Sequence, residues 1–398
     1  MQLTRKIAED TYYVGASDRR LELFENIYPI ERGVSYNSYM VLDEKTVLLD
    51  TVDHSVSRQF LENVRYVLSG RKLDYLIVNH VEPDHCATID TILREYPECR
   101  IVGNAKTIQF ISQFYDFDLS ERSHIVKEGD VLSSGKHSFT FVLAPMVHWP
   151  EVMVTYDTLT KILFSADAFG TFGALSGNLF ADELEFEKEW LDDARRYYLN
   201  IVGKYGVQVM NTLKKASTLD IAMICPLHGP IWRENIGWFI DKYKTWASYE
   251  AEEDGVLIVY SSIYGNTEQA MNYLALRLSD LGVRNIHMYD ASKTDSSYLL
   301  SDCFRYSKIV FASVTYNLEI FPKMESLLLD LKAHAFQNRK VAVVECGTWA
   351  LMSGKKMCEI LRSMKSVEIV GDKAVSILSN AGEETQKDLD ALAEALAK

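Results

Sequence analysis

Residues 80 to 85 read His-Val-Glu-Pro-Asp-His, so two imidazoles and two carboxylates fall within a very short stretch of chain. The preceding run "LDYLIVN" is apolar and typical of a buried strand. Burying two acids beside two histidines is costly unless a cation compensates for the lost hydration. The segment therefore predicts part of a metal site at the end of a strand.

Three more ligand-type residues follow apolar strands: His148 after "FTFVLAPMV", Asp167 after "ILFSA" and His228 after "AMICPL". A single histidine in such a place is most often a hydrogen-bonded loop residue, but the repetition of the pattern favours a shared site. The full candidate set is His80, Glu82, Asp84, His85, His148, Asp167 and His228. Mixed nitrogen and oxygen ligands suit iron or manganese better than zinc. So many ligands exceed one tetrahedral site, and they indicate a dinuclear centre with one bridging carboxylate.

The first part of the chain must position these residues. "YNSYMVL" and "TVLLDTV" form a predicted hairpin over 36–52, and helical spacing over 55–70 ends at Gly70. A predicted helix over 88–96 and helical segments over 182–216 accompany two separate groups of strands. Two groups of strands with helices outside them predict a sandwich of two sheets.

The pattern changes after the charged run "SYEAEEDG" at 248–255, which we interpret as the domain boundary. Five apolar strands then alternate with helical segments: "VLIVYSS", "NIHMYDA", "KIVFASVTY", "KVAVVECG" and "AVSILS". Continuous apolar strands in this rhythm predict a parallel sheet covered on both faces, with a flavodoxin-like order and ligands at the carboxyl ends of its strands. We therefore expect domains at residues 1–250 and 255–398.

The loop "VYSSIYGNTEQA" at 259–270 lies between the first strand and the first helix of this second domain. Its hydroxyls and backbone amides at a helix N-terminus favour a phosphate, although a simple capped turn is the alternative. The loop has no basic residue and no G-x-x-x-x-G-K-[ST] motif, so a triphosphate site is not indicated. The later strand ends at 313–322 and 345–354 offer aromatic and small residues that suit a flat ring.

Composition limits the remaining classes of function. The net charge of −14 argues against nucleic-acid binding, which needs clustered basic residues. No apolar run approaches the length of a membrane span, and the N-terminus lacks an apolar signal core, so we expect a cytoplasmic protein that does not bind membranes. None of the six cysteines form a C-x-x-C pair.

The chain resembles the flavodiiron proteins, or A-type flavoproteins. The resemblance is carried by the H-x-E-x-D-H motif, the later His148, Asp167 and His228, the "SYN-Y" hairpin, "HWP" at 148–150 and the flavodoxin-like half. The resemblance covers essentially the whole chain and is closest to the minimal two-domain class, such as the rubredoxin:oxygen oxidoreductases. It implies an α/β protein: an N-terminal metallo-β-lactamase-like αββα sandwich and a C-terminal flavodoxin-like doubly wound parallel sheet. It also implies that His80, Glu82 and His148 hold one iron and Asp84, His85 and His228 the other, with Asp167 bridging.

The same resemblance assigns the three loops of the second domain to FMN. The implied contacts are Ser262, Ile263, Tyr264, Gly265, Asn266, Thr267, Thr315, Tyr316, Asn317, Gly347, Thr348, Trp349 and Ala350. The implied enzyme reduces dioxygen to water, nitric oxide to nitrous oxide, or both. Its electrons would come from an external donor, rubredoxin or a reduced deazaflavin, and it would form a head-to-tail homodimer or a dimer of dimers.

Two other classes of function remain open at this point. One is a dinuclear metallo-hydrolase with an appended flavodoxin-like module; Glu82 argues against it, because the zinc hydrolases of this fold carry a histidine there. The other is an electron-transfer partner with an inactive metal site, which the intact ligand set disfavours. The chain departs from the family pattern at Glu25, where many relatives have a histidine, and at Ala350 and Leu351, which replace a glycine-rich run.

Overall fold

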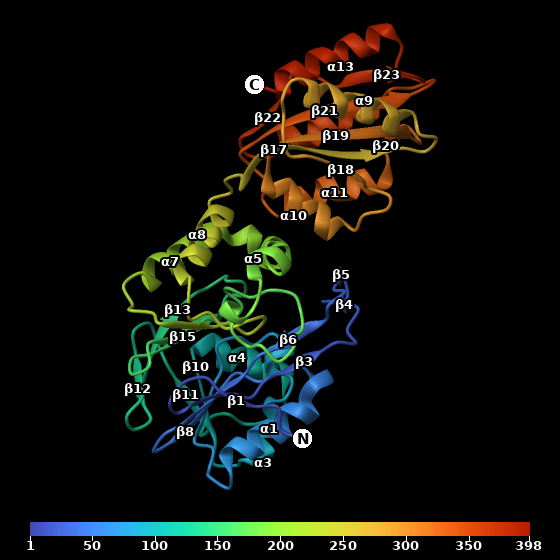
Figure 1. The fold of residues 1–398 in the computed structure, drawn as a ribbon. Helices are drawn as coiled ribbons and strands as arrows, with labels where there is room; N and C mark the ends of the chain where they lie inside the picture. Colours follow the sequence, from blue (N-terminus) through green and yellow to red (C-terminus); the bar gives the residue numbers. More distant parts are fainter. The chain divides into compact units, whose positions relative to one another are not determined.

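The computed structural model describes residues 1–398, which divide into two compact units (Figure 1). The first unit comprises residues 1–198 and 205–244, and the second comprises 199–204 and 245–398. None of the helices combines the length and the apolar character that crossing a membrane requires. Each unit has sheets of its own.

The first unit contains a seven-stranded sheet in the order β1-β2-β7-β8-β9-β10-β11. Its strands are β1 (Arg5–Lys6), β2 (Thr11–Tyr13), β7 (Tyr39–Leu42), β8 (Thr46–Leu49), β9 (Tyr75–Ile77), β10 (Arg100–Gly103) and β11 (Ser123–Ile125). Pairing is antiparallel from β1 to β8 and parallel from β8 to β11. The hairpin predicted over 36–52 is therefore confirmed as β7 and β8.

A five-stranded sheet and two short ribbons complete the strands of this unit. The sheet contains β12 (Val131–Ser133), β13 (Ser138–Leu143), β14 (Met153–Asp157), β15 (Ile162–Phe164) and β16 (Met223–Cys225) in sequence order. The ribbons pair β3 (Ala16–Asp18) with β6 (Val34–Tyr36) and β4 (Leu23–Phe24) with β5 (Tyr28–Pro29). The two sheets share a core, since the Tyr39 ring of β7 lies 5.4 Å from the Phe164 ring of β15.

Helices cover both sheets from outside, as a sandwich requires. The first unit has α1 (Ser57–Leu68), α2 (Pro83–Cys86), α3 (Ile89–Glu95), α4 (Ala105–Phe114), α5 (Phe186–Glu189), α6 (Leu191–Tyr197) and α7 (Gly206–Ala216), followed by α8 (Ile236–Ala247). Helix α1 ends where Ser69 adopts a left-handed conformation before Gly70, at φ of 47° and 86°. The helical segments predicted over 182–216 are confirmed as the short helices α5 and α6 and the longer helix α7. The predicted two-sheet sandwich is confirmed.

A buried histidine joins the two sheets near the β12–β13 turn. His137 Nδ1 lies 2.7 Å from Asp157 Oδ2, and the His137 backbone N–H donates to Asp43. Burial by itself lowers the pKa of His137, but the hydrogen bond and charge of Asp157 outweigh it and raise the pKa. Because the folded pKa lies above the unfolded one, this contribution to stability is complete below about pH 6.5 and is lost as the pH rises through the folded pKa.

We therefore expect His137→Gln to lower the free energy of unfolding by about 1–3 kcal/mol near pH 6, because Asp157 loses its buried partner. The loss should shrink at alkaline pH. Urea unfolding at several pH values measures it, with His124→Gln as a control on the half-buried histidine of β11. An equal loss at pH 6 and pH 9 would contradict the prediction.

The second unit is built on a parallel sheet in the order β18-β17-β19-β21-β22, with β23 also paired to β21. Its strands are β17 (Glu253–Ser261), β18 (Ile286–Asp290), β19 (Tyr306–Tyr316), β21 (Arg339–Gly347), β22 (Val367–Ile369) and β23 (Val375–Leu378), and a short β20 (Glu319–Ile320) pairs antiparallel with β19. All five predicted strands are present; β20 and β22 escaped prediction because they are so short. The order matches the flavodoxin-like arrangement.

Helices lie on both faces of this sheet (Figure 1). Helices α9 (Asn266–Asp280) and α13 (Glu383–Leu396) pack on one face, and α10 (Ser296–Arg305), α11 (Pro322–Ala333) and α12 (Ser353–Arg362) lie on the other. The core between α9, α13 and the sheet includes the fully buried Met271, Leu274 and Leu389. Coverage of both faces explains why the central strands are apolar throughout.

Candidate metal centre and cofactor pocket

The seven predicted ligand residues converge at the carboxyl ends of strands in the first unit. His80 follows β9, His148 follows β13, Asp167 follows β15, and His228 follows β16, while α2 carries Asp84 and His85. Their donor atoms form two groups that can each hold an ion: one of His80, Glu82, His148 and Asp167, and one of Asp84, His85 and His228.

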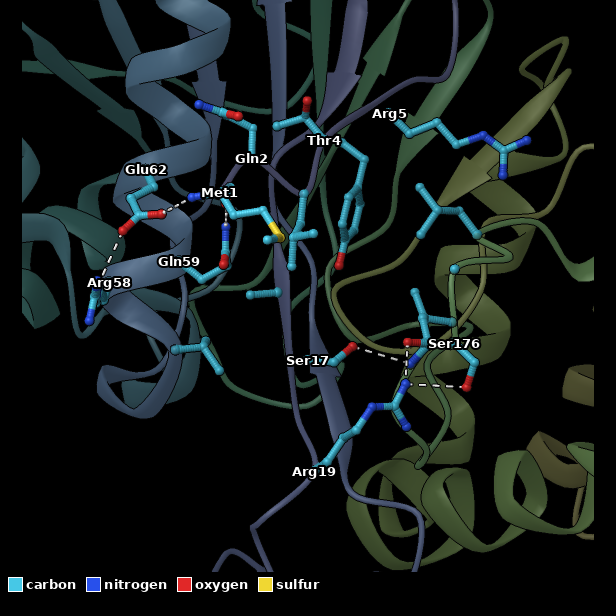
Figure 2. A pocket seen from close by; sticks show the side chains of 18 of the residues that line it. Met1, Gln2, Thr4, Arg5, Ser17, Arg19, Arg58, Gln59, Glu62 and Ser176 are labelled. Carbon is cyan, nitrogen blue, oxygen red and sulfur yellow. Dashed lines mark hydrogen bonds and ion pairs between the residues drawn. The ribbon is translucent and has the colours of Figure 1, made fainter.

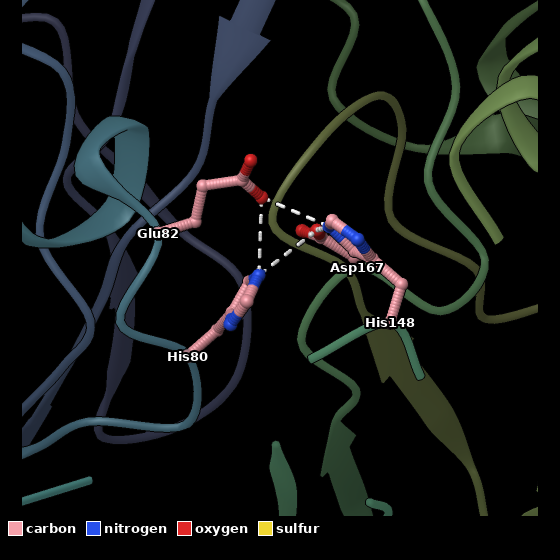
Figure 3. Close-up of side chains that lie close together, drawn as sticks. All are labelled: His80, Glu82, His148 and Asp167. Carbon is pink, nitrogen blue, oxygen red and sulfur yellow. Dashed lines mark hydrogen bonds and ion pairs between the residues drawn. The ribbon is translucent and has the colours of Figure 1, made fainter. Parts of the chain in front are cut away.

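The first group surrounds a point between two carboxylates and two imidazoles (Figure 3). Glu82 Oε2 lies 3.1 Å from His80 Nε2 and 2.9 Å from His148 Nε2. Asp167 Oδ2 lies 3.5 Å and 3.2 Å from the same two nitrogens. Both imidazoles thus direct Nε2 at the same pair of acids.

The second group uses the other oxygen of the same aspartate. Asp167 Oδ1 lies 3.0 Å from His85 Nε2 and 3.7 Å from His228 Nε2. Asp84 places Oδ1 3.4 Å from His85 Nε2 and Oδ2 3.3 Å from His228 Nε2. Asp167 therefore presents one oxygen to each group, which is the geometry that a carboxylate bridging two ions requires.

Several of these donor atoms are buried without a hydrogen-bond partner. They are both carboxylate oxygens of Asp84, Asp167 Oδ1, His85 Nε2 and His228 Nε2. A buried polar atom without a partner is costly, and convergent atoms of this kind fit cations. Four imidazoles with three carboxylates form a donor set that suits two iron ions.

The charges in the site are strongly coupled when no cation is present. Burial disfavours the ionised Asp167, but attraction to His85 and His80 and a hydrogen bond with His148 hold its pKa well below the usual range. Burial also disfavours the charged His148, yet hydrogen bonds with Asp167 and Glu82 raise its pKa to about 9. Protons on the imidazoles thus balance the acids, so binding of metal ions releases protons.

Hydrogen bonds behind the ligands orient two of the imidazoles. His80 Nδ1 lies 2.7 Å from Oε1 of the fully buried Glu151, which also accepts from the Val81 N–H. His228 Nδ1 lies 2.8 Å from the Ser35 carbonyl oxygen on β6. Each contact leaves Nε2 directed into the metal group. Sequence reasoning missed Glu151 and Ser35, although Glu151 directly follows the "HWP" motif.

We expect Glu151→Ala to weaken metal binding about 10- to 100-fold, because His80 would lose the group that fixes its tautomer and orientation. Iron content after dialysis against graded chelator concentrations measures the change. The matched control is Glu98→Ala, which removes an exposed carboxylate that forms an ion pair with Lys72. Unaltered iron retention in Glu151→Ala would contradict this role.

Glu25 lies in the turn between β4 and β5 at φ 50°, and it is not among the residues whose donor atoms form the two groups. Desolvation and repulsion from Glu82 raise its pKa to about 7.

The second unit has a cavity of about 220 Å³ at the carboxyl ends of β17, β19 and β21. It is lined by Ser262, Ile263, Tyr264, Asn266, Thr267, Val314, Thr315, Asn317, Leu318, Cys346, Gly347, Thr348, Trp349, Ala350 and Ser379. The three predicted loops therefore meet in one place. Of the predicted contacts, Gly265 and Tyr316 do not line this cavity; Val314, Leu318, Cys346 and Ser379 line it and were not predicted.

Two helices begin beside this cavity, and their N-termini differ. Helix α9 begins after Gly265, at φ 93°, and has no side-chain cap. Helix α12 is capped by its neighbours, since Thr315 Oγ1 accepts from the Ser353 N–H and Glu345 Oε2 accepts from the Gly354 N–H. The free amides of α9 therefore suit a phosphate, and those of α12 are already engaged.

Comparison with known proteins agrees with both halves of this description. Residues 34–229 match the family model described as ODP family beta lactamase, and residues 258–395 match the flavodoxin model. The anaerobic nitric oxide reductase flavorubredoxin of Klebsiella pneumoniae subsp. pneumoniae is 30% identical over 86% of this chain and 72% of its own length. The flavorubredoxin of Vibrio vulnificus is 31% identical over 87% and 70%. The structure of rubredoxin oxygen:oxidoreductase from Desulfovibrio gigas aligns with a TM-score of 0.93 and 26% identity, covering 99% and 98% of the two chains.

The first unit has a metallo-β-lactamase-like fold and donor groups for two ions, and the second has a flavodoxin-like fold and a loop that suits a phosphate. Together they define an oxidoreductase that combines a di-iron centre with FMN. The chain belongs to the flavodiiron protein family. The family predicted from the sequence is thereby confirmed, and so are the fold of both halves and the cofactors.

Proposed function

We propose that this chain reduces dioxygen to water, nitric oxide to nitrous oxide, or both, at a di-iron centre that receives electrons from FMN. The observation that carries the proposal is the placement of Asp167 between the two donor groups, with its oxygens 3.0 Å and 3.2 Å from His85 and His148. The relatives named as nitric oxide reductases and the structure named as an oxygen oxidoreductase support the two substrates.

The geometry of the two donor groups supports the ligand assignment that the family resemblance implies. His80, Glu82 and His148 would hold one iron, Asp84, His85 and His228 the other, and Asp167 would bridge them. When bound, the irons supply open coordination positions for a diatomic gas and exchange electrons with it. The residues around them hold the ligands in place: Glu151 fixes the ring of His80, and the Ser35 carbonyl fixes that of His228.

The residues of the second unit would bind FMN through the three loops that meet at its cavity. Amides at the start of α9 and the hydroxyls of Ser262 and Thr267 would bind the phosphate, and the loops from β19 and β21 would hold the ring. We place the metal domain at residues 1–250 and the FMN domain at 255–398. FMN bound there would supply electrons for the metal site. The reduction of one dioxygen to two waters takes four electrons and four protons.

We propose a head-to-tail homodimer or a dimer of dimers, in which the flavin of one subunit would face the di-iron centre of the other. Tyr264 and Trp349 at the flavin cavity are 93% and 81% exposed, and Ile27 of the β4–β5 turn is 58% exposed. Tyr264 and Trp349 line the flavin cavity, where a bound flavin or a second subunit would cover them. We propose rubredoxin, or a reduced deazaflavin, as the external electron donor, and the cytoplasm as the compartment.

Gas consumption by the purified protein tests the proposal. The chain should be yellow, with about one FMN and two irons, and after anaerobic reduction it should consume dioxygen or nitric oxide supplied separately. A colourless zinc protein that cleaves esters or thioesters would instead indicate the metallo-hydrolase. A yellow iron protein that consumes neither gas would refute the proposed reaction and leave the cofactors in place.

A further inference from the structure

The first unit also contains a groove of about 1070 Å³ (Figure 2). Four segments distant in sequence form it: residues 1–5, residues 13–20 around β3, the start of α1 over 55–62, and the loop 175–179. None of the seven metal-ligand candidates lines it. We propose that this groove docks an acidic peptide segment of a partner protein.

Charge is the first observation that supports this ligand. Arg5, Arg19, Arg20 and Arg58 line the groove, and Glu62 is its one acidic lining residue, in a chain whose net charge is −14. Arginine is the side chain best suited to carboxylates, because its planar fork binds them through two hydrogen bonds. A cationic groove on a protein with a negative net charge attracts acidic ligands to that groove.

The arginines are available to a ligand to different degrees. Arg5 is engaged by Glu183, with N–O distances of 2.8 Å and 2.5 Å. Arg58 has only a 3.3 Å contact with Glu62 at 93% side-chain exposure, and an exposed pair of this kind is worth little. Arg20 likewise lies 3.7 Å from Asp18 at 82% exposure.

Arg19 has no carboxylate partner. Its Nη2 donates to the Leu175 carbonyl at 2.6 Å and to Ser176 Oγ at 3.2 Å, so the guanidinium is held against the 175–179 loop while other N–H groups stay free. Figure 2 shows Arg19 and Arg58 on opposite sides of the groove. A single carboxylate reaches one side only, whereas an extended chain with several acids reaches both.

The lining between the arginines suits a peptide. Buried apolar groups of Tyr13, Val56, Leu175 and Leu179 line it beside the uncharged polar side chains of Gln2, Thr4, Ser17 and Gln59. Apolar side chains can bury on the former, and peptide amides can pair with the latter. The groove volume of about 1070 Å³ exceeds the range of roughly 300–1,000 Å³ that is typical of small-molecule sites, which favours a longer ligand.

Fluorescence anisotropy with the full, cofactor-loaded protein tests this proposal. The probe is a labelled hexapeptide of four glutamates and two leucines, and its companion has glutamines in place of the glutamates. We expect the acidic probe to bind at low salt, to bind at least about tenfold more tightly than the companion, and to dissociate near 0.5 M salt, where charges are screened beyond about 4 Å.

Substitutions then locate the binding site. Arg19→Glu with Arg58→Glu should weaken probe binding by at least about tenfold, and the milder Arg19→Gln with Arg58→Gln should weaken it less, through loss of charge alone. The control pair is Arg94→Glu with Arg100→Glu, at two exposed arginines outside the groove. It makes the same change of net charge and should have little effect on binding of the probe.

Three results would overturn the proposal. They are failure of the acidic probe to bind, equal binding of the glutamine companion, and equal loss of binding in the control pair. Tighter binding of an oligothymidylate of equal charge, lost in the same groove variants, would assign the groove to nucleic acid instead. Gas consumption is not a readout here, so the result is independent of the proposed reaction.

Discussion

Asp167→Ala is expected to remove the di-iron centre and to lower gas consumption by roughly a thousandfold, the equivalent of about 4 kcal/mol in the barrier. Asp167 is the one residue whose two oxygens face both donor groups, at 3.0 Å from His85 Nε2 and 3.2 Å from His148 Nε2. Its loss leaves each group one oxygen short and removes the negative charge between two dications. Iron analysis and anaerobic assays with each gas measure the effect.

The same variant should retain FMN, because Asp167 belongs to the first unit and the flavin cavity to the second. Asp167→Asn provides a milder case, since the amide keeps one oxygen for one ion. Asp220→Ala, at an aspartate with 78% side-chain exposure, controls for the loss of a carboxylate. If Asp167→Ala kept its iron and its turnover, the bridging role and the proposed reaction would both be wrong.

Gly347→Ala is expected to lower FMN affinity roughly 10- to 100-fold while leaving the iron content unchanged. A Cβ atom at position 347 would lie 2.1 Å from the Ala350 carbonyl oxygen, closer than any van der Waals contact. The loop from Gly347 to Ala350 would have to open, and this loop lines the flavin cavity. Flavin release followed by fluorescence gives the affinity directly.

Gly382→Ala is the matched control, since a Cβ atom there would have no neighbour within 4 Å. Electron delivery from a chemical reductant to the metal site should fall in Gly347→Ala and recover when excess FMN is added. Full FMN occupancy at wild-type affinity in Gly347→Ala would show that the turn at 347–350 does not shape the flavin site.

The sequence by itself determined the types of chemistry and the elements that carry it. His148, Asp167 and His228 each follow an apolar run, and these runs contain the strands β13, β15 and β16. The alternation of strand and helix after residue 255 likewise follows from local periodicity, and it was sufficient to predict a parallel sheet with its ligand loops at the carboxyl ends of the strands.

Tertiary structure alone decided how these residues meet. That Asp167 turns one oxygen to each donor group, and that Glu151 lies behind His80, depends on two sheets packing together from segments far apart in the chain. The groove lined by Arg19 and Arg58 arises in the same way. Local sequence patterns predict secondary structure because a helix or a strand is formed by residues that are neighbours in the sequence. Contacts between distant segments depend on the packing of the whole unit, which no short pattern specifies.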